Sequence, residues 1–237
     1  MKAVIVAAGM GSRMHGQKPK TLLPFHDETI LSTIVRNLSL AGIGEIIIVV
    51  GFMADHIREY VTKHTSKLGV SVSLVENHQF TRGNGISVLA SENAVGNANF
   101  ILSMSDHVVT PSAIARVVHC ASAANLLLVD PRVASVFDID DATKVNTAGE
   151  KILDIGKTIS VYNALDCGIF RLTPRFFESM REQLLRDKDS ISDAVKVLIR
   201  NKDMEAVFMQ DNEQWFDVDT PEAYADALSK TSPPPHS

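Results

Sequence analysis

Apolar residues in the first hundred positions form short continuous runs separated by helically spaced sets. The runs at 3–8, 45–51, 71–75 and 99–104 are predicted strands, and the continuous runs among them are typical of strands buried on both faces. Between them, Ile30, Ile34 and Leu38 recur at helical spacing, and residues 54–64 carry a second apolar stripe. Strands that alternate with helices of this length predict a parallel or mostly parallel sheet with helices on both sides.

The pattern changes after the next predicted strand, at 125–129. Three short apolar segments follow, at 143–146, 151–155 and 164–172, and a turn sequence joins the first two, so the sheet is expected to turn antiparallel there. Further elements are predicted at 174–185 (helix), from Ser190 (helix capped with Asp193), at 205–209 (a last edge strand) and at 220–228 (helix). The sequence therefore predicts an α/β fold with a three-layer, doubly wound, mostly parallel mixed sheet. We expect one domain over residues 1–230 and a disordered Pro-rich tail at 231–237.

Composition narrows the class of protein without fixing its function. The 237 residues are 45% hydrophobic and 22% charged, which is ordinary for a water-soluble globular chain. The net charge of −5 argues against a nucleic-acid or anionic-membrane surface, although a local basic pocket for phosphates stays compatible with it. Cys120 and Cys167 lack disulfide-framework or metal-ligand spacing and are expected to be reduced and structural. With neither a signal peptide nor a membrane-length apolar run, the protein is expected to be cytoplasmic and not inserted in a membrane.

The most informative stretch follows the first predicted strand. Gly9 and Gly11 allow backbone N–H groups to approach a phosphate, and Arg13 and Lys20 supply positive charge. The loop is not a dinucleotide fingerprint, because Met14 stands where a third glycine belongs, and it lacks the Gly-Lys-Ser/Thr of a P-loop. Ordinary turn chemistry is the alternative explanation for the glycines alone.

Acidic residues follow two other predicted strands and are candidate Mg²⁺ ligands. Asp106 comes after the strand at 99–104, and Asp219 comes after a short apolar segment near the C-terminus. Mg²⁺ takes one or two carboxylates while keeping several waters, so two distant Asp side chains are enough to hold one ion. The alternative for Asp219 is that it only caps the helix that Pro221 begins. His107 has no zinc-type spacing to another His or Cys and is expected to be a supporting or packing residue.

The sequence AAGMGSRM followed by KPKTLLPF resembles the signature of the sugar-phosphate nucleotidyltransferases of the MobA-like NTP transferase superfamily, which have a Rossmann-like, GT-A-type fold. The resemblance implies that Arg13 and Lys20 are catalytic and stabilise charge at the α-phosphate and the leaving pyrophosphate. It implies that Asp106 and Asp219 bind the metal, with Asp217 as second choice. The loop residues implied to wrap the triphosphate are Ala7, Ala8, Gly9, Met10, Gly11, Ser12, Arg13 and Lys20.

A narrower resemblance rests on pieces spread in order over most of the chain. These pieces are Val75-Glu76-Asn77, Gly83 to Ser87, Met104 to His107, Asp141 to Val145, Asp154 to Lys157 and Tyr162 to Phe170. Together they resemble the cytidylyltransferases that make CDP-alcohols, most of all inositol-1-phosphate cytidylyltransferase. The resemblance implies CTP with Mg²⁺, and Asn84, Gly85 and Ser87 near the base and ribose. The implied pocket for a small phosphorylated acceptor is formed by Lys144, Lys157, Asn163 and Asp166.

Several alternatives stay open at this point. The acceptor could be phosphocholine or a phosphonate such as 2-aminoethylphosphonate. The inositol enzymes are often fused to a membrane phosphotransferase domain that these 237 residues do not include, so the chain is expected either to act alone or to be one domain of a longer protein. A uridylyl- or guanylyltransferase acting on a sugar 1-phosphate is the nearest rival, and a nucleotide-sensing module without turnover is a rival of another class. A glycosyltransferase would carry Asp-x-Asp where this chain has Ser105-Asp106-His107. A homo-oligomer is possible.

Overall fold

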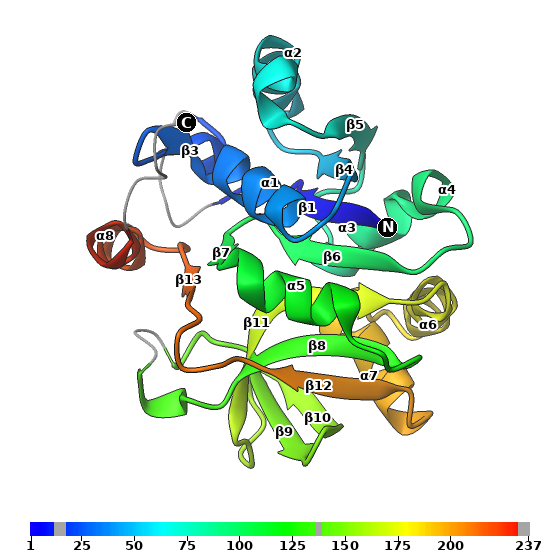
Figure 1. Cartoon of the computed structure of the whole chain (residues 1–237). Helices are drawn as coiled ribbons and strands as arrows, with labels where there is room; N and C mark the ends of the chain where they lie inside the picture. The colour runs from blue at the N-terminus through cyan, green and yellow to red at the C-terminus, as the bar shows by residue number, and fades with distance from the viewer. Residues whose placement is uncertain (12–17, 136–138, 232–237) are drawn as a thin grey trace.

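A nine-stranded mixed sheet organises the chain in a computed structural model that describes residues 1–11, 18–135 and 139–231 (Figure 1). From one edge to the other the strands are β5 (Ser71–Glu76), β4 (Glu45–Val50), β1 (Lys2–Ala7), β6 (Phe100–Met104), β11 (Ala164–Leu172), β8 (Asn125–Asp130), β12 (Met204–Phe208), β10 (Lys151–Gly156) and β9 (Lys144–Ala148). The α/β class expected from the sequence is confirmed.

The N-terminal half of the sheet is parallel, as its apolar runs predict. β1 lies between β4 and β6 and pairs in parallel with both, and β5 extends the same arrangement beyond β4. Residues 3–7 of β1 are all buried, because a central strand in this arrangement is covered on both faces. Parallel strands end at the same edge of the sheet, so the segments after β1 and β6 meet there.

The C-terminal half of the sheet contains the antiparallel pairings, and one expectation about it needs correction. β11 runs antiparallel to both β6 and β8, and β10 is antiparallel to β12 and β9, so the sheet is mixed, as the sequence predicts. The antiparallel turn expected from residue 143 onward is confirmed. The prediction that residues 205–209 form an edge strand is wrong, because β12 lies between β8 and β10. The β9–β10 hairpin folds back beside β12 and leaves β9 as the edge strand.

Helices pack on both faces of this sheet, where two hydrophobic clusters form the core. Alternate residues of β1 separate the clusters: Ala3 and Ile5 belong to one, Val4 and Val6 to the other. The first cluster takes side chains from α1 (Ile30–Leu40), α2 (Ala54–Leu68), α5 (Pro111–His119) and α8 (Pro221–Lys230). The second takes them from α3 (Asn84–Ala90), α4 (Glu92–Val95), α6 (Arg175–Leu184) and α7 (Ile191–Arg200). Figure 1 shows α1 and α5 in front of the sheet and α6 and α7 behind it.

Local sequence signals set the ends of several helices. Ser190 and Asp193 form a reciprocal capping box at the start of α7, as predicted. Pro111 occupies the first turn of α5, where its missing N–H costs nothing. Residues 84–95 form two short helices rather than one, because α3 and α4 are divided at Ser91.

Short strand pairs and 3₁₀ turns complete the described chain. β2 (Pro24–Phe25) pairs with β3 (Glu28–Thr29), and β7 (His107–Val109) pairs with β13 (Trp215–Asp217). The 3₁₀ turns are η2 (Lys20–Leu22) and η3 (Val133–Ser135). The β7–β13 pair matters most for the site, because it holds the segment after β6 against the segment before α8.

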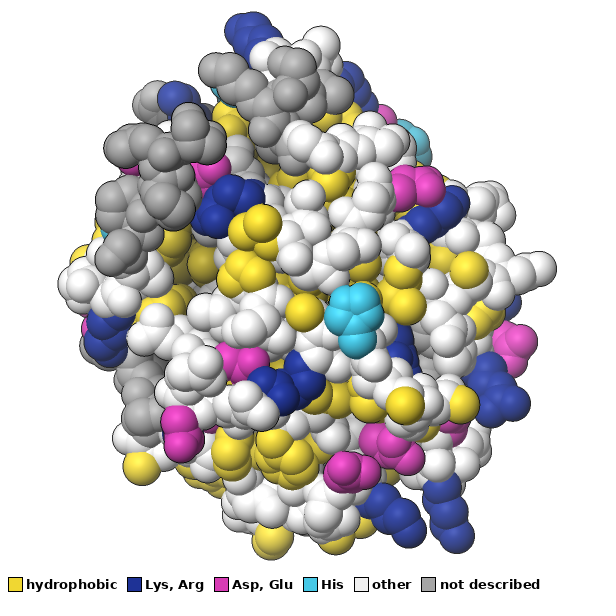
Figure 2. All heavy atoms as spheres, in the orientation of Figure 1, with side chains coloured by type: hydrophobic (Ala, Val, Ile, Leu, Met, Phe, Trp, Pro, Cys, Tyr) yellow, Lys and Arg dark blue, Asp and Glu magenta, His cyan; other side chains and the backbone are white. Residues whose placement is uncertain are grey.

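Within the described ranges, no helix has the length and apolar character needed to cross a membrane. Acidic and basic side chains are interspersed over the face seen in Figure 2 rather than gathered by sign. Cys120 and Cys167 are free thiols, as expected. The predicted disordered tail lies outside the described residues beyond Thr231.

Candidate active site

A cleft of about 320 Å³ opens at the carboxyl end of the parallel strands. Its walls combine the segment after β1, the η2 turn, the start of α3 and the segment after β6. The lining residues include Ala7, Gly9, Gly11, Lys20, Thr21, Phe80, Arg82, Asn84, Ser87, Asp106 and Asp219. The topology thus brings together the glycine loop and both predicted metal carboxylates, which are more than one hundred residues apart in sequence.

Lys20 is the electrostatic centre of this cleft. Its Nζ lies 2.9 Å from Asp106 Oδ2 and also contacts Asp219 Oδ1, while only 10% of its side chain is exposed. Burial alone would lower the pKa of Lys20, but the two carboxylates outweigh burial and raise it above its ordinary value. Lys20 therefore stays charged at any physiological pH.

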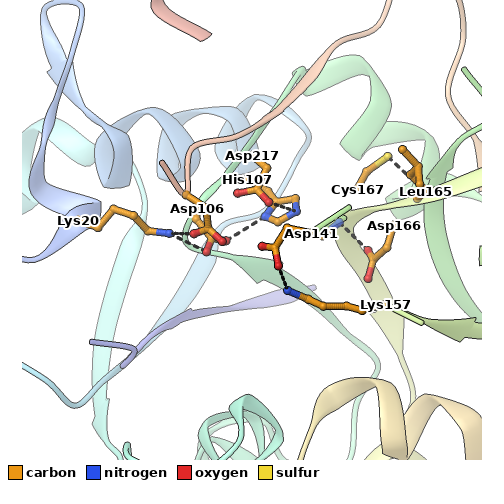
Figure 3. A network of polar contacts seen from close by, with 11 residues as sticks. Lys20, Asp106, His107, Asp141, Lys157, Leu165, Asp166, Cys167 and Asp217 are labelled. Atoms are coloured by element: carbon orange, nitrogen blue, oxygen red, sulfur yellow. Dashed lines mark hydrogen bonds and ion pairs between the residues drawn. The ribbon is translucent and has the colours of Figure 1, made fainter. Parts of the chain in front are cut away.

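Asp106 is held as a carboxylate by a cation on each side (Figure 3). Its Oδ1 accepts a hydrogen bond from His107 Nδ1 at 2.9 Å, while Lys20 binds the other oxygen. Burial would raise the pKa of Asp106, but Lys20 and His107 hold it well below its usual range. Burial likewise opposes charge on His107, yet Asp217, Asp106 and Asp166 raise its pKa to about 9.

Packing fixes the imidazole of His107 in place. The ring stacks on Trp215 with 5.4 Å between ring centroids, and the β7–β13 pair brings these two residues together. Gly168 also lies close to the ring: a Cβ added there would be 2.7 Å from His107 Cγ, and the Gly168 φ of +75° also disfavours any side chain. Sequence reasoning expected a packing or supporting role for His107 but did not identify Gly168 or Trp215 as its partners.

Asp219 does not cap α8. The N-cap of α8 is Thr220, whose side chain accepts a hydrogen bond from Ala223 N, so the capping alternative raised by the sequence is wrong. The Asp219 carboxylate instead faces Lys20 in the cleft. Helix α8 thus starts one residue after a side chain that contributes to the charged centre.

Asp217 adds a third carboxylate beside Asp106 and His107. Ligand atoms of these three residues lie within 4.8 Å of one another, an arrangement that could hold a metal ion. Burial raises the pKa of Asp217 to about 6 despite the neighbouring His107. Within the described residues its Oδ1 is buried and has no hydrogen-bond partner, so this oxygen can serve as a ligand atom. Asp217, the second choice from sequence, is thus as well placed as Asp219.

A second cavity of about 190 Å³ adjoins the cleft, and both are lined by Asn84, Met104, Asp106 and Asp219. Lys157 and Asp141 line it and form an ion pair of 2.8 Å. Asp166 also lines it, and burial raises the pKa of Asp166 to about 6 while its Oδ1 accepts a hydrogen bond from Gly168 N. Two of the four predicted acceptor-binding residues, Lys157 and Asp166, are therefore at this cavity.

The other two, Lys144 and Asn163, are engaged in local structure instead. Lys144 is 8% exposed, and its Nζ donates to the carbonyl oxygens of Asp140 and Ala142 at 3.1 and 3.2 Å. Asn163 binds Thr147 through both its amide oxygen and its amide nitrogen, which ties the start of β11 to β9. Neither residue is among the described residues that line the two cavities.

The predicted nucleotide-binding residues divide in a similar way. Ala7, Gly9, Gly11, Lys20, Asn84 and Ser87 line the cleft. Ala8 is buried behind it, Met10 is exposed, and Gly85 packs against Asp189 and Met180, which leave no room for a Cβ. Ser12 and Arg13 lie outside the described residues.

Three residues of the cleft carried no usable signal in the sequence. Phe80 and Arg82 come from the irregular segment before α3, and Arg82 is held by Asp189 and Gln79. Thr21, next to Lys20, has a buried hydroxyl without a partner among the described residues. The sequence did not indicate which side chains of the segment after β5 face the cleft.

Comparison with known proteins agrees with a nucleotide-binding cleft after β1. Residues 3–137 match the MobA-like NTP transferase domain, which covers more than half of the chain. The chain belongs to the MobA-like NTP transferase family. The signature loop, Lys20 and Asp106 all fall inside the matched region of this NTP transferase, whereas Asp217 and Asp219 lie beyond it.

Relatives and solved structures extend the likeness over nearly the whole transferase chain. It is 32% identical over 222 residues to the bifunctional IPC transferase and DIPP synthase of Rubrobacter xylanophilus, covering 93% of this chain and 49% of that protein. The protein of the same description from Thermococcus kodakarensis is 35% identical, with 93% and 48% covered. The chain thus spans about half the length of these relatives. The structure of the inositol-1-phosphate CTP transferase from T. maritima superimposes with a TM-score of 0.84 at 26% identity, covering 97% of this chain and 95% of that one.

Proposed function

We propose that this protein is a Mg²⁺-dependent cytidylyltransferase that transfers CMP from CTP to a small phosphorylated alcohol, with inositol 1-phosphate favoured, and releases pyrophosphate. One observation carries the proposal: the cleft and the second cavity adjoin and share Asp106 and Asp219. A nucleotide in the cleft and an acceptor in the second cavity would therefore meet beside Lys20. A site that only sensed a nucleotide would not need this second compartment.

The chain's charged groups suit phosphoryl transfer without a general base. A phosphate monoester is already ionised near neutral pH, so its oxygen can attack the α-phosphorus of CTP directly. The obstacle is repulsion between two anions, and Lys20, with Arg13 as implied by the signature, would neutralise the nucleotide's phosphates. Lys157 would hold the acceptor phosphate in line, because its ammonium is at the second cavity, where it pairs with Asp141.

The acidic residues fit the metal that the family implies. Mg²⁺ prefers carboxylate oxygens. Asp106 and Asp219 present them to the Lys20 ammonium, which marks a place favourable to a cation, and Asp106 also lies in a group of potential ligands with Asp217. Asp106 with Asp219 or Asp217 would hold the ion, and Lys20 would shift from the carboxylates toward the phosphates. When bound, Mg²⁺ supplies charge neutralisation at the phosphate oxygens.

The relatives support the choice of nucleotide and acceptor. Proteins described as IPC transferases and an inositol-1-phosphate CTP transferase align with this chain over nearly its full length. The second cavity agrees with a polyol phosphate, since Asp141, Asp166 and Asp217 offer acceptors for hydroxyl groups and Lys157 offers a phosphate contact. Phosphocholine, 2-aminoethylphosphonate and a sugar 1-phosphate with UTP or GTP are the alternatives that the assay must separate.

Other expectations accompany this proposal as predictions. They are the three-layer, doubly wound arrangement, a single domain over residues 1–230, a cytoplasmic location, the absence of nucleic-acid partners and a possible homo-oligomer. The mixed sheet with helices on both faces supports the first of these.

The test is pyrophosphate release with CTP, UTP, GTP and ATP in Mg²⁺, each against inositol 1-phosphate, phosphocholine, 2-aminoethylphosphonate and hexose 1-phosphates. We expect release only with CTP and inositol 1-phosphate. Release with another acceptor would keep the cytidylyl transfer and change the substrate. Nucleotide binding without release across the whole panel would contradict the proposal and favour a sensing module.

A further inference from the structure

Asn77 and Ser87 form a hydrogen-bonded pair far from the charged centre. Asn77 directly follows β5 and Ser87 lies in α3, and the two residues are 3% and 4% exposed. Three strand spacings separate β5 from β6, the strand before Asp106, which amounts to about 14 Å. Ser87 nevertheless lines the same cleft as Lys20. A nucleotide with its phosphates at Lys20 would therefore bring its nucleoside end toward Ser87.

The direction of the hydrogen bonds in this pair is determined. Asn77 Oδ1 accepts from the backbone N–H of Gln79 at 2.8 Å. Because a backbone N–H can only donate, this contact identifies the amide oxygen and leaves the amide NH₂ facing Ser87 Oγ at 2.9 Å. An amide NH₂ cannot accept, so the Ser87 oxygen accepts and its hydroxyl hydrogen must point elsewhere.

The Ser87 hydroxyl hydrogen has no acceptor within the part of the chain that the structure describes. By contrast, the buried hydroxyl of Ser91, at the end of the same helix, donates to Val88 O at 2.6 Å. Ser87 differs because its oxygen is anchored by Asn77 and borders the cleft. The hydroxyl hydrogen is thus available to donate to an acceptor atom of a ligand in the cleft.

We infer that Asn77 is a positioning residue that fixes Ser87 as a hydrogen-bond donor to the acceptor edge, O2 or N3, of the nucleotide base. The identity of that base as cytosine rests on the proposed function. Asn77 is not among the described residues that line the cleft, so it acts through Ser87. Its backbone N–H also bonds Val50 O at 2.8 Å, which anchors it to the neighbouring strand and gives it a rigid base.

Substitution Asn77→Asp tests the inference, because it keeps the acceptor for Gln79 N–H and removes the donor to Ser87. A carboxylate there would draw the Ser87 hydrogen toward itself and leave oxygen lone pairs facing the base. We expect Asn77→Asp and Ser87→Ala each to lower CTP affinity about tenfold or more in calorimetry with Mg²⁺ and no acceptor. The double variant should lose no more than the larger single loss, because both changes remove the same hydrogen bond.

The chain offers a matched control in Asn125. This buried amide also accepts from a backbone N–H, that of Thr173 at 2.7 Å, and donates to a carbonyl, Asp203 O at 3.0 Å, but it lies at the start of β8 away from both cavities. Asn125→Asp should change CTP affinity less than twofold. Inorganic tripolyphosphate is the second control, because it lacks a base. Ser87→Ala and Asn77→Asp should lower the affinity for CTP but leave the affinity for tripolyphosphate unchanged.

Three results would overturn the inference. Asn77→Asp could lower CTP affinity by the same factor in the Ser87→Ala background as in the wild type, which would assign the loss to the added charge. Tripolyphosphate could lose as much affinity as CTP, which would place the effect at the phosphates. Ser87→Ala could leave CTP affinity unchanged. If Asn77→Asp does not fold by circular dichroism, Asn77→Ala replaces it, and its loss of CTP affinity should again vanish in the Ser87→Ala background.

These binding measurements separate the inference from the proposed function. They need no acceptor and no turnover, so a protein that binds CTP through Ser87 but releases no pyrophosphate with any acceptor would contradict only the proposed transfer. If the wild type transfers CMP as proposed and the Ser87→Ala variant turns over CTP equally well, with an unchanged KM for CTP, only the inference is contradicted.

Discussion

Lys20 and Lys144 are both largely buried, but the partners of Lys20 are charged and those of Lys144 are not. Lys20 lies between two carboxylates, those of Asp106 and Asp219, at a cleft that it helps to line. Lys144 donates to two backbone carbonyls, those of Asp140 and Ala142, in the segment that leads into β9. The sequence resemblance implied a ligand-binding role for both.

We expect this difference in partners to separate a ligand-binding lysine from a structural one. Carboxylates can exchange Lys20 for a metal ion and release its ammonium toward a phosphate, because each partner keeps a favourable counter-ion during the exchange. The carbonyl groups that hold Lys144 carry no net charge, and releasing its amino group would leave them without a donor. Burial alone therefore does not identify a functional lysine, whereas the chemistry of its partners does.

The largest effect is expected from Lys20→Ala. Loss of one charge contact to the transition state should lower kcat by 10²-fold or more, measured by pyrophosphate release with CTP and inositol 1-phosphate. The circular dichroism spectrum should stay that of the native fold. Lys151→Ala, at an exposed position on β10, is the matched control and should behave as wild type. A normal rate for Lys20→Ala would remove Lys20 from the mechanism and make the two buried lysines equivalent.

The charged centre should also give the protein a pH-dependent stability. His107 has a pKa of about 9 in the folded protein against 6.5 for an ordinary histidine, so its contribution is fully present below about pH 6.5. As pH rises from 6.5 to 9, the folded state keeps a proton that the unfolded chain has lost, and the free energy of unfolding should fall by on the order of 3 kcal/mol.

The measurement is urea denaturation at pH 6.5 and 9 in EDTA, on the wild type and on His107→Gln. The variant should lose most of this pH dependence. The chosen window lies above the pKa values of Asp166 and Asp217, both about 6, so these groups do not obscure the result. An equal slope in His107→Gln would show that other groups cause it.

The fold and the site differ in how far the sequence predicts them. Continuous apolar runs identified the parallel strands β1, β4 and β6 because a strand buried on both faces leaves that local signature. The position of β12 in the sheet was not predictable, since it depends on where the β9–β10 hairpin folds back, and that pairing is not local.

In the candidate site, too, the sequence predicts some features and not others. Strand ends placed Asp106 correctly at the cleft, because topology alone sends a residue after β6 to that edge. The direction of a side chain is a different matter: Asn163 faces Thr147, and Gly85 packs on Asp189, because of contacts made by segments distant in sequence. The role of Gly168 in holding the His107 ring depends on a three-dimensional contact of the same kind.

Asp219→Asn sharpens the comparison from the side of the carboxylate. It keeps the size of the side chain and Thr220 still caps α8, so the fold should be unaffected. We expect about a tenfold rise in the Mg²⁺ concentration for half-maximal rate, because an amide oxygen is a weaker ligand than a carboxylate. An unchanged Mg²⁺ titration would assign the metal to Asp106 and Asp217, and Asp217→Asn would then show the rise.

The smallest effects should come from the lysines of the acceptor side, and they differ in kind. Lys157 is 54% exposed at the second cavity and is paired with Asp141, so Lys157→Ala should raise the KM for inositol 1-phosphate about three- to tenfold with little change in thermal stability. Lys144→Met would leave the carbonyls of Asp140 and Ala142 without their donor, and it should lower the free energy of unfolding by about 1–3 kcal/mol. Steady-state kinetics and urea denaturation of both variants give the comparison. If Lys144→Met instead raised the acceptor KM more than Lys157→Ala does, Lys144 would release its carbonyls on binding, and the distinction between charged and uncharged partners would fail.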